Sequence, residues 1–184
     1  MAVTVRLAEV RDARAVTRAH VAAWQVAYRG IFPDSFLDDM TRELEDRVRR
    51  WERIIVSPDV PGTVTIVAEL DGEVVGWLGY GPTRDDDLAP AERGGTGEVY
   101  GIYVHPDRWG SGAGRALLGE GVARLEEAGF VQATLWVLED NRSARRFYEH
   151  HGWRHDGARE VFERAGVRPM ELRYRRPLGE AAGA

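Results

Sequence analysis

The segment 98–118 joins an apolar, strand-like run to a glycine-rich loop and then to a helical pattern. The loop carries Gly110, Gly112 and Gly114 at alternate positions, which is more glycine than a connecting turn requires, since each one costs conformational entropy on folding. A helix that begins directly after such a loop leaves backbone N–H groups unpaired at the positive end of its dipole. The segment therefore favours an anion-binding loop, with phosphate as the expected ligand, over a simple glycine turn.

Two common nucleotide-binding patterns do not fit this loop. The dinucleotide fingerprint requires G-x-G-x-x-G, but Arg115 stands three positions after Gly112. The mononucleotide loop requires Gly-Lys followed by Ser or Thr, and the sequence contains no lysine, all 25 basic residues being arginine. The phosphate ligand should therefore be of another kind.

Composition narrows the remaining classes. The chain has 184 residues, of which 43% are hydrophobic and 30% charged, and this predicts one globular domain over residues 1–178 with a frayed tail at 179–184. The formal net charge of −5 argues against a nucleic-acid partner. No apolar run approaches 18 residues and the first ten residues lack the pattern of a signal peptide, so we expect a cytoplasmic protein without a membrane partner.

Metal and thiol chemistry are not indicated. The sequence has no cysteine, which excludes a disulfide framework, a thiolate zinc site and a cysteine nucleophile. His150 and His151 are adjacent but have no third ligand at metal spacing, so no metal site is expected.

Hydrophobic periodicity predicts a mixed α/β fold with the order β-α-α-β-β-β-α-β-α-β-β. Asp71-Gly72 is a strong two-residue hairpin signal, and Gly152 is the expected left-handed cap of the last helix. The proline- and aspartate-rich segment 81–96 is expected to be an exposed loop. The predicted strands are 4–8, 63–70, 73–80, 98–104, 132–137, 153–162 and 167–174, and the predicted helices are 11–28, 37–55, 111–128 and 141–151.

With this order, two motifs make the chain resemble the GNAT superfamily of N-acetyltransferases. The family's loop motif runs Gln/Arg-x-x-Gly-x-Gly/Ala, and it appears here as WGSGAG at 109–114, with Trp109 in place of Gln or Arg. The second motif, LEDNRSARRFYEHHGW at 138–153, is similar to the family's Asn-x-x-Ala-x-x-Phe-Tyr-x-x-x-Gly-Phe signature. The resemblance covers nearly the whole chain and implies a single-domain acyltransferase fold with a splayed central strand pair.

The resemblance implies acetyl-coenzyme A (acetyl-CoA) as the acetyl donor. Its pyrophosphate would lie over the amides of the glycine loop, and its pantetheine arm would run along the edge of the central strand, where the N–H of Val104 would polarise the acetyl carbonyl. Asn141, Ala144 and Tyr148 share one helical face turned toward the coenzyme. The implied coenzyme-binding residues are Ile102, Tyr103, Val104, Trp109, Gly110, Ser111, Gly112, Ala113, Gly114, Arg115, Asn141 and Ala144.

The same resemblance implies the catalytic groups. Tyr148 would be the general acid, since a phenol of pKa about 10 is protonated at neutral pH and can donate to a thiolate of pKa about 8.5. Glu98 would be the base, through water, although a strand-terminal glutamate is often only solvated. A water chain is the alternative base. His105 is a further titrating group near the site, but its place before Pro106 favours a role in a turn.

The acceptor is less constrained. Trp24, Tyr28 and Trp77 are the candidate residues for a pocket that binds a small primary amine, and a cationic amine such as a polyamine or an aminoglycoside would suit a negative rim. A protein lysine or N-terminal acetyltransferase is the alternative, and a non-catalytic acyl-CoA sensor is the alternative of another class. The resemblance is also compatible with a homodimer. The rim residues are Asp34, Asp38, Asp39, Asp85, Asp86, Asp87 and Glu163.

Overall fold

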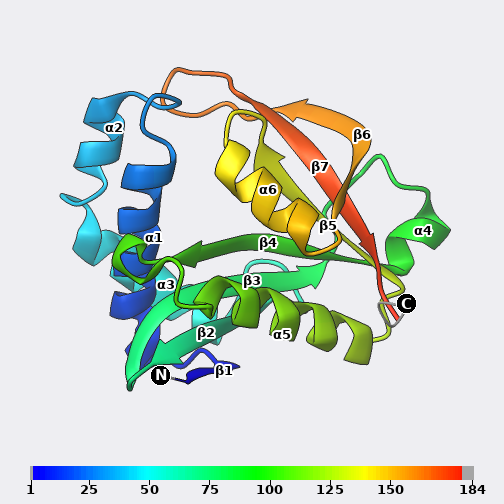
Figure 1. The fold of residues 1–184 in the computed structure, drawn as a ribbon, viewed down its shortest axis with the longest axis horizontal. Helices are drawn as coiled ribbons and strands as arrows, with labels where there is room; N and C mark the ends of the chain where they lie inside the picture. The colour runs from blue at the N-terminus through cyan, green and yellow to red at the C-terminus, as the bar shows by residue number, and fades with distance from the viewer. Residues whose placement is uncertain (1, 180–184) are drawn as a thin grey trace. The chain divides into compact units, whose positions relative to one another are not determined.

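The computed structural model describes residues 2–179, so the predicted tail lies outside them apart from Gly179. The described residues form two compact units. The first unit comprises residues 2–79 and 101–121, and the second comprises 80–100 and 122–179. The strands follow the order β1-β2-β3-β4-β5-β7-β6 in one seven-stranded sheet, and the mixed α/β architecture expected from the sequence is confirmed (Figure 1).

The first unit contains the helices that follow the first strand. α1 packs one face on the sheet, because Val16 and Ala19 are fully buried against Val67 and Trp77. β1 pairs antiparallel with β2, and the predicted strands and first helix are recovered within a few residues at each end. The elements are β1 (Val3–Leu7), α1 (Ala13–Ala27), α2 (Asp34–Asp39), α3 (Leu44–Val56), β2 (Val64–Leu70) and most of β3 (Glu73–Pro82).

The predicted second helix, 37–55, is wrong as a single element, since α2 ends at Asp39 and α3 begins at Leu44. In a continuous helix, the N–H of Thr41 would bond to the carbonyl of Leu37. That carbonyl instead accepts a hydrogen bond from Nε2 of Gln25 at 2.9 Å, while the Thr41 N–H turns to Asp38. A distant side chain thus interrupts the helix, and the hydrophobic spacing on either side of the break cannot show it.

The second unit is built on antiparallel strands that flank β7. β7 pairs with β5 on one side and with β6 on the other, and α6 lies over these strands (Figure 1). The parallel register of β4 with β5 joins Thr96–Val99 to Gln132–Leu135, and β4 continues to Val104. The elements are α4 (Pro90–Gly94), the start of β4 (Thr96–Val104), the end of α5 (Ala113–Glu127), β5 (Gln132–Leu138), α6 (Arg142–His150), β6 (Arg154–Val161) and β7 (Met170–Pro177).

The segment 81–96 is only in part the exposed loop that its composition predicts, since it contains the end of β3 and all of α4 and several of its residues are buried. Asp85 is only 6% exposed, and its carboxylate accepts hydrogen bonds from Trp136 Nε1 at 2.7 Å and Thr134 Oγ1 at 2.9 Å. The buried guanidinium of Arg173 lies 3.5 Å away and also binds Asp87 at 2.6 Å. Buried charges persist when they are paired and hydrogen-bonded. The partners come from β5 and β7, so a run of aspartates in the sequence gives no sign of them.

The glycine signals for turns are confirmed. Asp71 and Gly72 have φ of 54° and 82°, as a primed hairpin turn requires. Gly152 has φ of 83° directly after α6, in the position of the expected left-handed cap.

Gly76 lies where the backbones of β3 and β4 approach each other closely within the first unit. A Cβ built there would lie 2.8 Å from the carbonyl oxygen of Tyr103 and 3.1 Å from Cα of Val104. Because these are backbone atoms, they cannot rotate away. We expect Gly76→Ala to lower the free energy of unfolding by about 1–3 kcal/mol, as overpacking does, which urea denaturation would measure. Gly119→Ala is the control, because this glycine is exposed, lies outside the left-handed region and has nothing within 4 Å of the new Cβ, and an equal loss there would contradict the contact argument.

Among the described residues, no helix is both long enough and apolar enough to cross a bilayer.

Candidate functional site

The glycine loop follows β4 through a short 3-10 turn, Pro106–Arg108, and leads into α5. Gly110 and Gly112 have φ of 80° and 88°, which L side chains rarely adopt. A Cβ built at either glycine would meet nothing within 4 Å. The loop thus needs glycine for its backbone shape, and it leaves open space in which a ligand can approach the main chain.

The start of α5 supplies donors to this space. Ala113 begins the helix, so the N–H groups of Gly114 and Arg115 have no helical carbonyl one turn earlier to pair with. Within the loop, Ser111 N–H bonds to the carbonyl of Arg108 at 3.2 Å, and Ala113 N–H bonds to Ser111 Oγ at 3.4 Å. Amides in a glycine frame at a helix N-terminus fit a pyrophosphate, so the residues present suit the coenzyme that the motif implies.

Trp109 has a structural role in place of the family's Gln or Arg. Its indole Nε1 donates to the carbonyl of Val104 at 2.8 Å, although 52% of the residue is exposed. The side chain therefore ties the beginning of the loop to the end of β4. On the other side, the N–H of His105 bonds to the carbonyl of Val75 at 2.8 Å, so β3 also holds this end of the strand.

β4 carries the other implied coenzyme-binding residues of the first unit, Ile102, Tyr103 and Val104. Their strand extends beyond Val99, where the parallel register with β5 stops. Gly101 is part of the continuous strand, and a Cβ there would come within 3.1 Å of the Tyr103 ring and 3.6 Å of the Trp77 ring. A close approach of side chains, rather than of another backbone, explains this glycine.

α6 positions the second motif in the second unit. Asn141 is the N-cap, because its Oδ1 accepts a hydrogen bond from the N–H of Ala144 at 3.1 Å. Tyr148 lies on the same helical face and is 7% exposed. Its ring centroid is 6.4 Å from that of Trp153 and 6.5 Å from that of Tyr174. The ring of Tyr148 is thus held by packing against these two aromatic side chains.

Glu98 is not the solvated strand end that its position in the sequence allows. The residue is 1% exposed, and its carboxylate forms an ion pair with Arg84. One oxygen also accepts from the backbone N–H of Arg84 at 2.8 Å, and the guanidinium stacks over the ring of Tyr100, 4.3 Å from its centroid. Arg84 is a partner that the sequence analysis missed, because fourteen positions separate it from Glu98 and no short motif connects them.

The three candidate acceptor residues, Trp24, Tyr28 and Trp77, lie in one aromatic cluster of the first unit. The cluster also contains Tyr103, whose hydroxyl is 3.3 Å from that of Tyr28. It also contains His20, whose ring stacks on Tyr103 with centroids 4.7 Å apart and planes 5° apart, and Trp51, Phe32 and Phe36 contact its edge. Sequence reasoning missed His20, although its spacing of four from Trp24 and eight from Tyr28 was a usable signal.

The acidic rim is largely neutralised by arginines. Arg29 pairs with Asp34 and Asp38, and Arg42 pairs with Asp39. In the second unit, Arg173 binds Asp85 and Asp87. Asp86 and Glu163 have longer pairs, 3.4 Å to Arg93 and 3.5 Å to Arg168. These carboxylates stabilise loops, and the rim offers little net charge to a cationic amine.

A different carboxylate pair remains, and no motif pointed to it. Glu160 on β6 and Glu171 on β7 are direct partners in the antiparallel register. Burial, reinforced by the charge of Glu160, raises the pKa of Glu171 to about 7. Arg84 opposes this rise and Glu98 adds to it, so the pair lies within the electrostatic reach of the buried Glu98–Arg84 ion pair.

This pair predicts a pH dependence of stability. A carboxylate whose pKa is higher in the folded state than in the unfolded state binds its proton more tightly when folded, so stability falls as pH rises from about 4.5 to about 7 and then levels off. Glu171→Gln should therefore raise the free energy of unfolding at pH 8, by about 1 kcal/mol after allowance for solvent screening, and by nothing at pH 4. Urea denaturation at both pH values would check this. Equal gains at pH 4 and pH 8 would contradict it.

No group of His, Asp or Glu in the described part of the chain could hold a metal ion. His151 Nδ1 is 2.7 Å from the carbonyl of Phe147, and His105 Nδ1 accepts from the N–H of Asp107 at 3.3 Å. Both histidines thus take part in local structure, His105 in the turn that its proline indicates.

Comparison with known proteins agrees with the motifs. Residues 21–153 match the acetyltransferase (GNAT) family. An uncharacterized N-acetyltransferase of Bacillus subtilis, YuaI, is 34% identical over 171 residues, which cover 92% of this chain and 90% of that protein. An aminoglycoside N(6')-acetyltransferase of Stenotrophomonas maltophilia is 33% identical over 67% of this chain and 72% of its own.

The fold is shared with solved structures. A yncA acetyltransferase from Salmonella typhimurium, solved with its cofactor acetyl-CoA, superposes with a TM-score of 0.69 at 22% identity, over 100% of this chain and 98% of that one. The glycine loop, the capped α6 and the family match over most of the chain point to one conclusion. The chain belongs to the GNAT acetyltransferase family, and it is an N-acetyltransferase that uses acetyl-CoA.

Proposed function

We propose that this enzyme transfers the acetyl group to a primary amine of a small cationic molecule, by direct attack within a ternary complex. Acetyl-CoA supplies the acetyl group as an activated thioester. The amides of residues 110–115 hold its pyrophosphate, and Arg115 in the first turn of α5 adds a charged contact. The main chain of Ile102, Tyr103 and Val104 binds the pantetheine arm, with the Val104 N–H donating to the carbonyl oxygen as negative charge develops there.

Two side chains move protons in this proposal. Tyr148 donates its hydroxyl proton to the departing thiolate sulfur. Glu98 accepts the proton of the attacking amine through a water molecule. Arg84 holds the Glu98 carboxylate in place, because Oε2 of Glu98 lies 2.8 Å from the backbone N of Arg84. Since the carboxylate is engaged there, a water molecule carries the proton from the amine to Glu98 in this proposal. Asn141 fixes the start of α6 and, with Ala144, contacts the coenzyme.

The aromatic cluster is the observation that carries the choice of acceptor. His20, Trp24 and Tyr28 form one row along α1 and its C-terminal end. This row lies beside Tyr103 of β4, the strand proposed to bind the pantetheine arm of acetyl-CoA. Aromatic faces attract ammonium groups, which suits an organic cation. A relative named as an aminoglycoside acetyltransferase supports the same class. Trp77 and Trp24 are mostly buried, so in this proposal they back the pocket while Tyr28 contacts the acceptor.

A panel assay tests the acceptor class. The enzyme is incubated with acetyl-CoA and, separately, with a polyamine, an aminoglycoside, a lysine-containing peptide and a peptide with a free N-terminus. Free thiol is followed over time and the products are identified by mass spectrometry. We expect the small cations to give a kcat/KM at least about 10-fold above either peptide, a difference of about 1.4 kcal/mol in transition-state stabilisation.

The other outcomes separate the alternatives. A higher kcat/KM with a peptide would replace the small-molecule proposal by a protein acetyltransferase. Binding of acetyl-CoA without acceptor-dependent thiol release across the panel would support an acyl-CoA sensor.

A further inference from the structure

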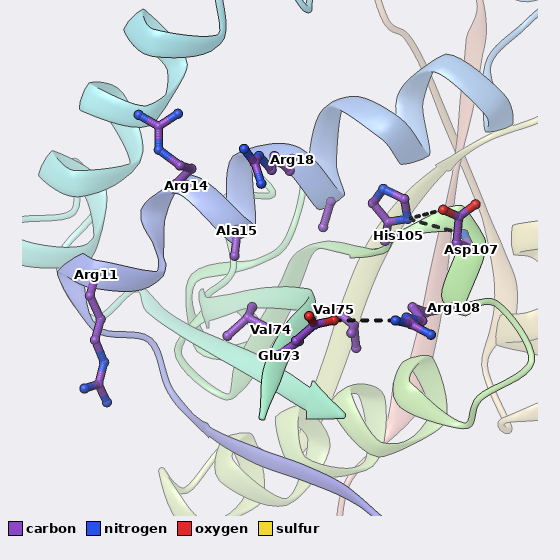
Figure 2. Close-up of a pocket in the computed structure, with 11 residues that line it drawn as sticks. Arg11, Arg14, Ala15, Arg18, Glu73, Val74, Val75, His105, Asp107 and Arg108 are labelled. Carbon is purple, nitrogen blue, oxygen red and sulfur yellow. Dashed lines mark hydrogen bonds and ion pairs between the residues drawn. The ribbon is translucent and has the colours of Figure 1, made fainter. Parts of the chain in front are cut away.

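A pocket of about 650 Å³ opens in the first unit, beside the turn that precedes the glycine loop (Figure 2). α1 forms one wall, the beginning of β3 forms the floor, and the turn after β4 forms the far side (Figure 2). Its volume is in the range of small-molecule sites. None of residues 109–115 lines it. The lining residues are Arg11, Arg14, Ala15, Arg18, Ala19, Glu73, Val74, Val75, His105, Asp107 and Arg108.

The pocket is cationic in an acidic protein. Four arginines and one histidine line it against two carboxylates, whereas the whole chain carries a net charge of −5. Arg11 belongs to the short 3-10 turn Val10–Asp12, and Arg14 and Arg18 lie one turn apart on α1. Ala15, Ala19, Val74 and Val75 give the same pocket an apolar floor. A cationic rim over an apolar floor suits an organic anion.

Two of the four arginines are already paired with carboxylates outside the pocket. Arg14 binds Glu45 of α3 through two contacts of 2.8 Å, and in Figure 2 it points up toward that helix. Arg11 binds Glu9 through Nε at 2.9 Å, which leaves both of its terminal nitrogens as donors. These two arginines therefore contribute charge and spare donors rather than the main contacts.

Arg18 and Arg108 are the cations most available to a ligand. Arg18 forms no hydrogen-bonded ion pair like that of Arg14 among the described residues, although its charge helps to lower the pKa of Glu45 on α3. Arg108 has one long contact, 3.5 Å to Glu73, drawn as a dashed line across the pocket in Figure 2. A dianion placed between these guanidiniums would gain charge-assisted, bidentate hydrogen bonds that the present contacts do not supply.

We propose that this pocket, hereafter the Arg18 pocket, binds a small organic phosphate, with the phosphoryl group between Arg18 and Arg108 and the organic part on the alanine and valine floor. Arginine forks match phosphate oxygens geometrically, and His105 adds a donor at the edge. The ligand is separate from acetyl-CoA. The Arg18 pocket adjoins the glycine loop, because Arg108 directly precedes Trp109 in the chain. A phosphate bound in the pocket would therefore contact the turn Pro106–Arg108 that leads into this loop.

Calorimetric titration of the full-length enzyme with phenyl phosphate, inorganic phosphate and phenol tests the proposal, each in the presence of saturating coenzyme A. We expect saturable binding of phenyl phosphate, at least about 5-fold weaker binding of inorganic phosphate because it lacks contact with the apolar floor, and no binding of phenol. Arg18→Gln/Arg108→Gln should weaken phenyl phosphate binding by about 10-fold or more.

Arg42→Gln/Arg50→Gln is the matched control, since it also removes two positive charges, but from exposed positions elsewhere in the first unit. It should change the phenyl phosphate affinity by less than about 2-fold. Thermal unfolding of both double variants verifies that they fold. Unchanged affinity in Arg18→Gln/Arg108→Gln, or an equal loss in the control, would overturn the site. Binding that appears only without coenzyme A would also overturn it, because the phosphate would then lie in the coenzyme loop.

Discussion

Replacing Tyr148 by Phe is expected to lower kcat by about 100-fold or more and to leave the KM for acetyl-CoA within about 2-fold. The substitution removes one hydroxyl and keeps the ring, which packs near Trp153 and Tyr174, so the helix face stays intact. Without that proton donor the thiolate must leave as an anion. The lost proton transfer occurs in the transition state and not in the bound ground state. The substitution should therefore lower kcat much more than it changes the KM for acetyl-CoA.

Tyr174→Phe is the matched control, because it removes a buried hydroxyl from the same unit. That hydroxyl donates to Glu149 at 2.7 Å and accepts from Arg145 at 3.1 Å, and both contacts are structural. The control should lose about 1 kcal/mol of unfolding free energy with little change in kcat. Steady-state kinetics and urea denaturation on both variants separate the two roles. Full turnover in Tyr148→Phe would show that water or another group protonates the thiolate.

The second large effect is expected at the glycine loop. Gly112→Asp should raise the KM for acetyl-CoA by about 100-fold, because a carboxylate would stand beside amides proposed to hold a pyrophosphate. Gly112 has φ of 88°, and a Cβ added there meets no heavy atom within 4 Å. The loss should therefore come from repulsion of the ligand and not from a clash within the protein.

Two comparisons isolate that repulsion. Gly112→Asn has nearly the same shape without the charge, and it should raise the KM by much less, about 10-fold or below. Gly72→Asp places the same carboxylate at φ of 82° in the hairpin turn, again in open space, so it repeats the backbone strain away from the loop. It should leave the KM unchanged. Equal effects of Asp and Asn at residue 112 would argue that loop shape, rather than anion binding, was lost.

The sequence predicts what local patterns encode. The glycine loop, the Asp71-Gly72 hairpin and the Gly152 cap each depend on a few neighbouring residues, and the structure has all three in the expected places. The order of the strands follows from hydrophobic period and is recovered with shifts of a few residues at the ends, whereas the second helix is divided in two and α4 was not predicted. The roles of the site residues stay predictions until the variants are measured.

The misses share a physical cause, which is contact between residues far apart in the chain. Gln25 interrupts the helix at Leu37, and Arg173 helps to bury Asp85 in what reads as a loop. The high pKa of Glu171 depends on burial and on the cross-strand neighbour Glu160. None of these has a short motif, because each arises only when strands or helices pair in space.

The tie between Trp109 and Val104 has a consequence for the thermodynamics of ligand binding. The indole bond of 2.8 Å, the Ser111–Arg108 bond and the helical start at Ala113 fix the loop through contacts that are local in the chain. The loop loses its conformational entropy when the protein folds, not when a ligand arrives. Ordering the loop is therefore part of folding, and the pyrophosphate that we propose to bind there would gain its contacts without a further cost for ordering these amides.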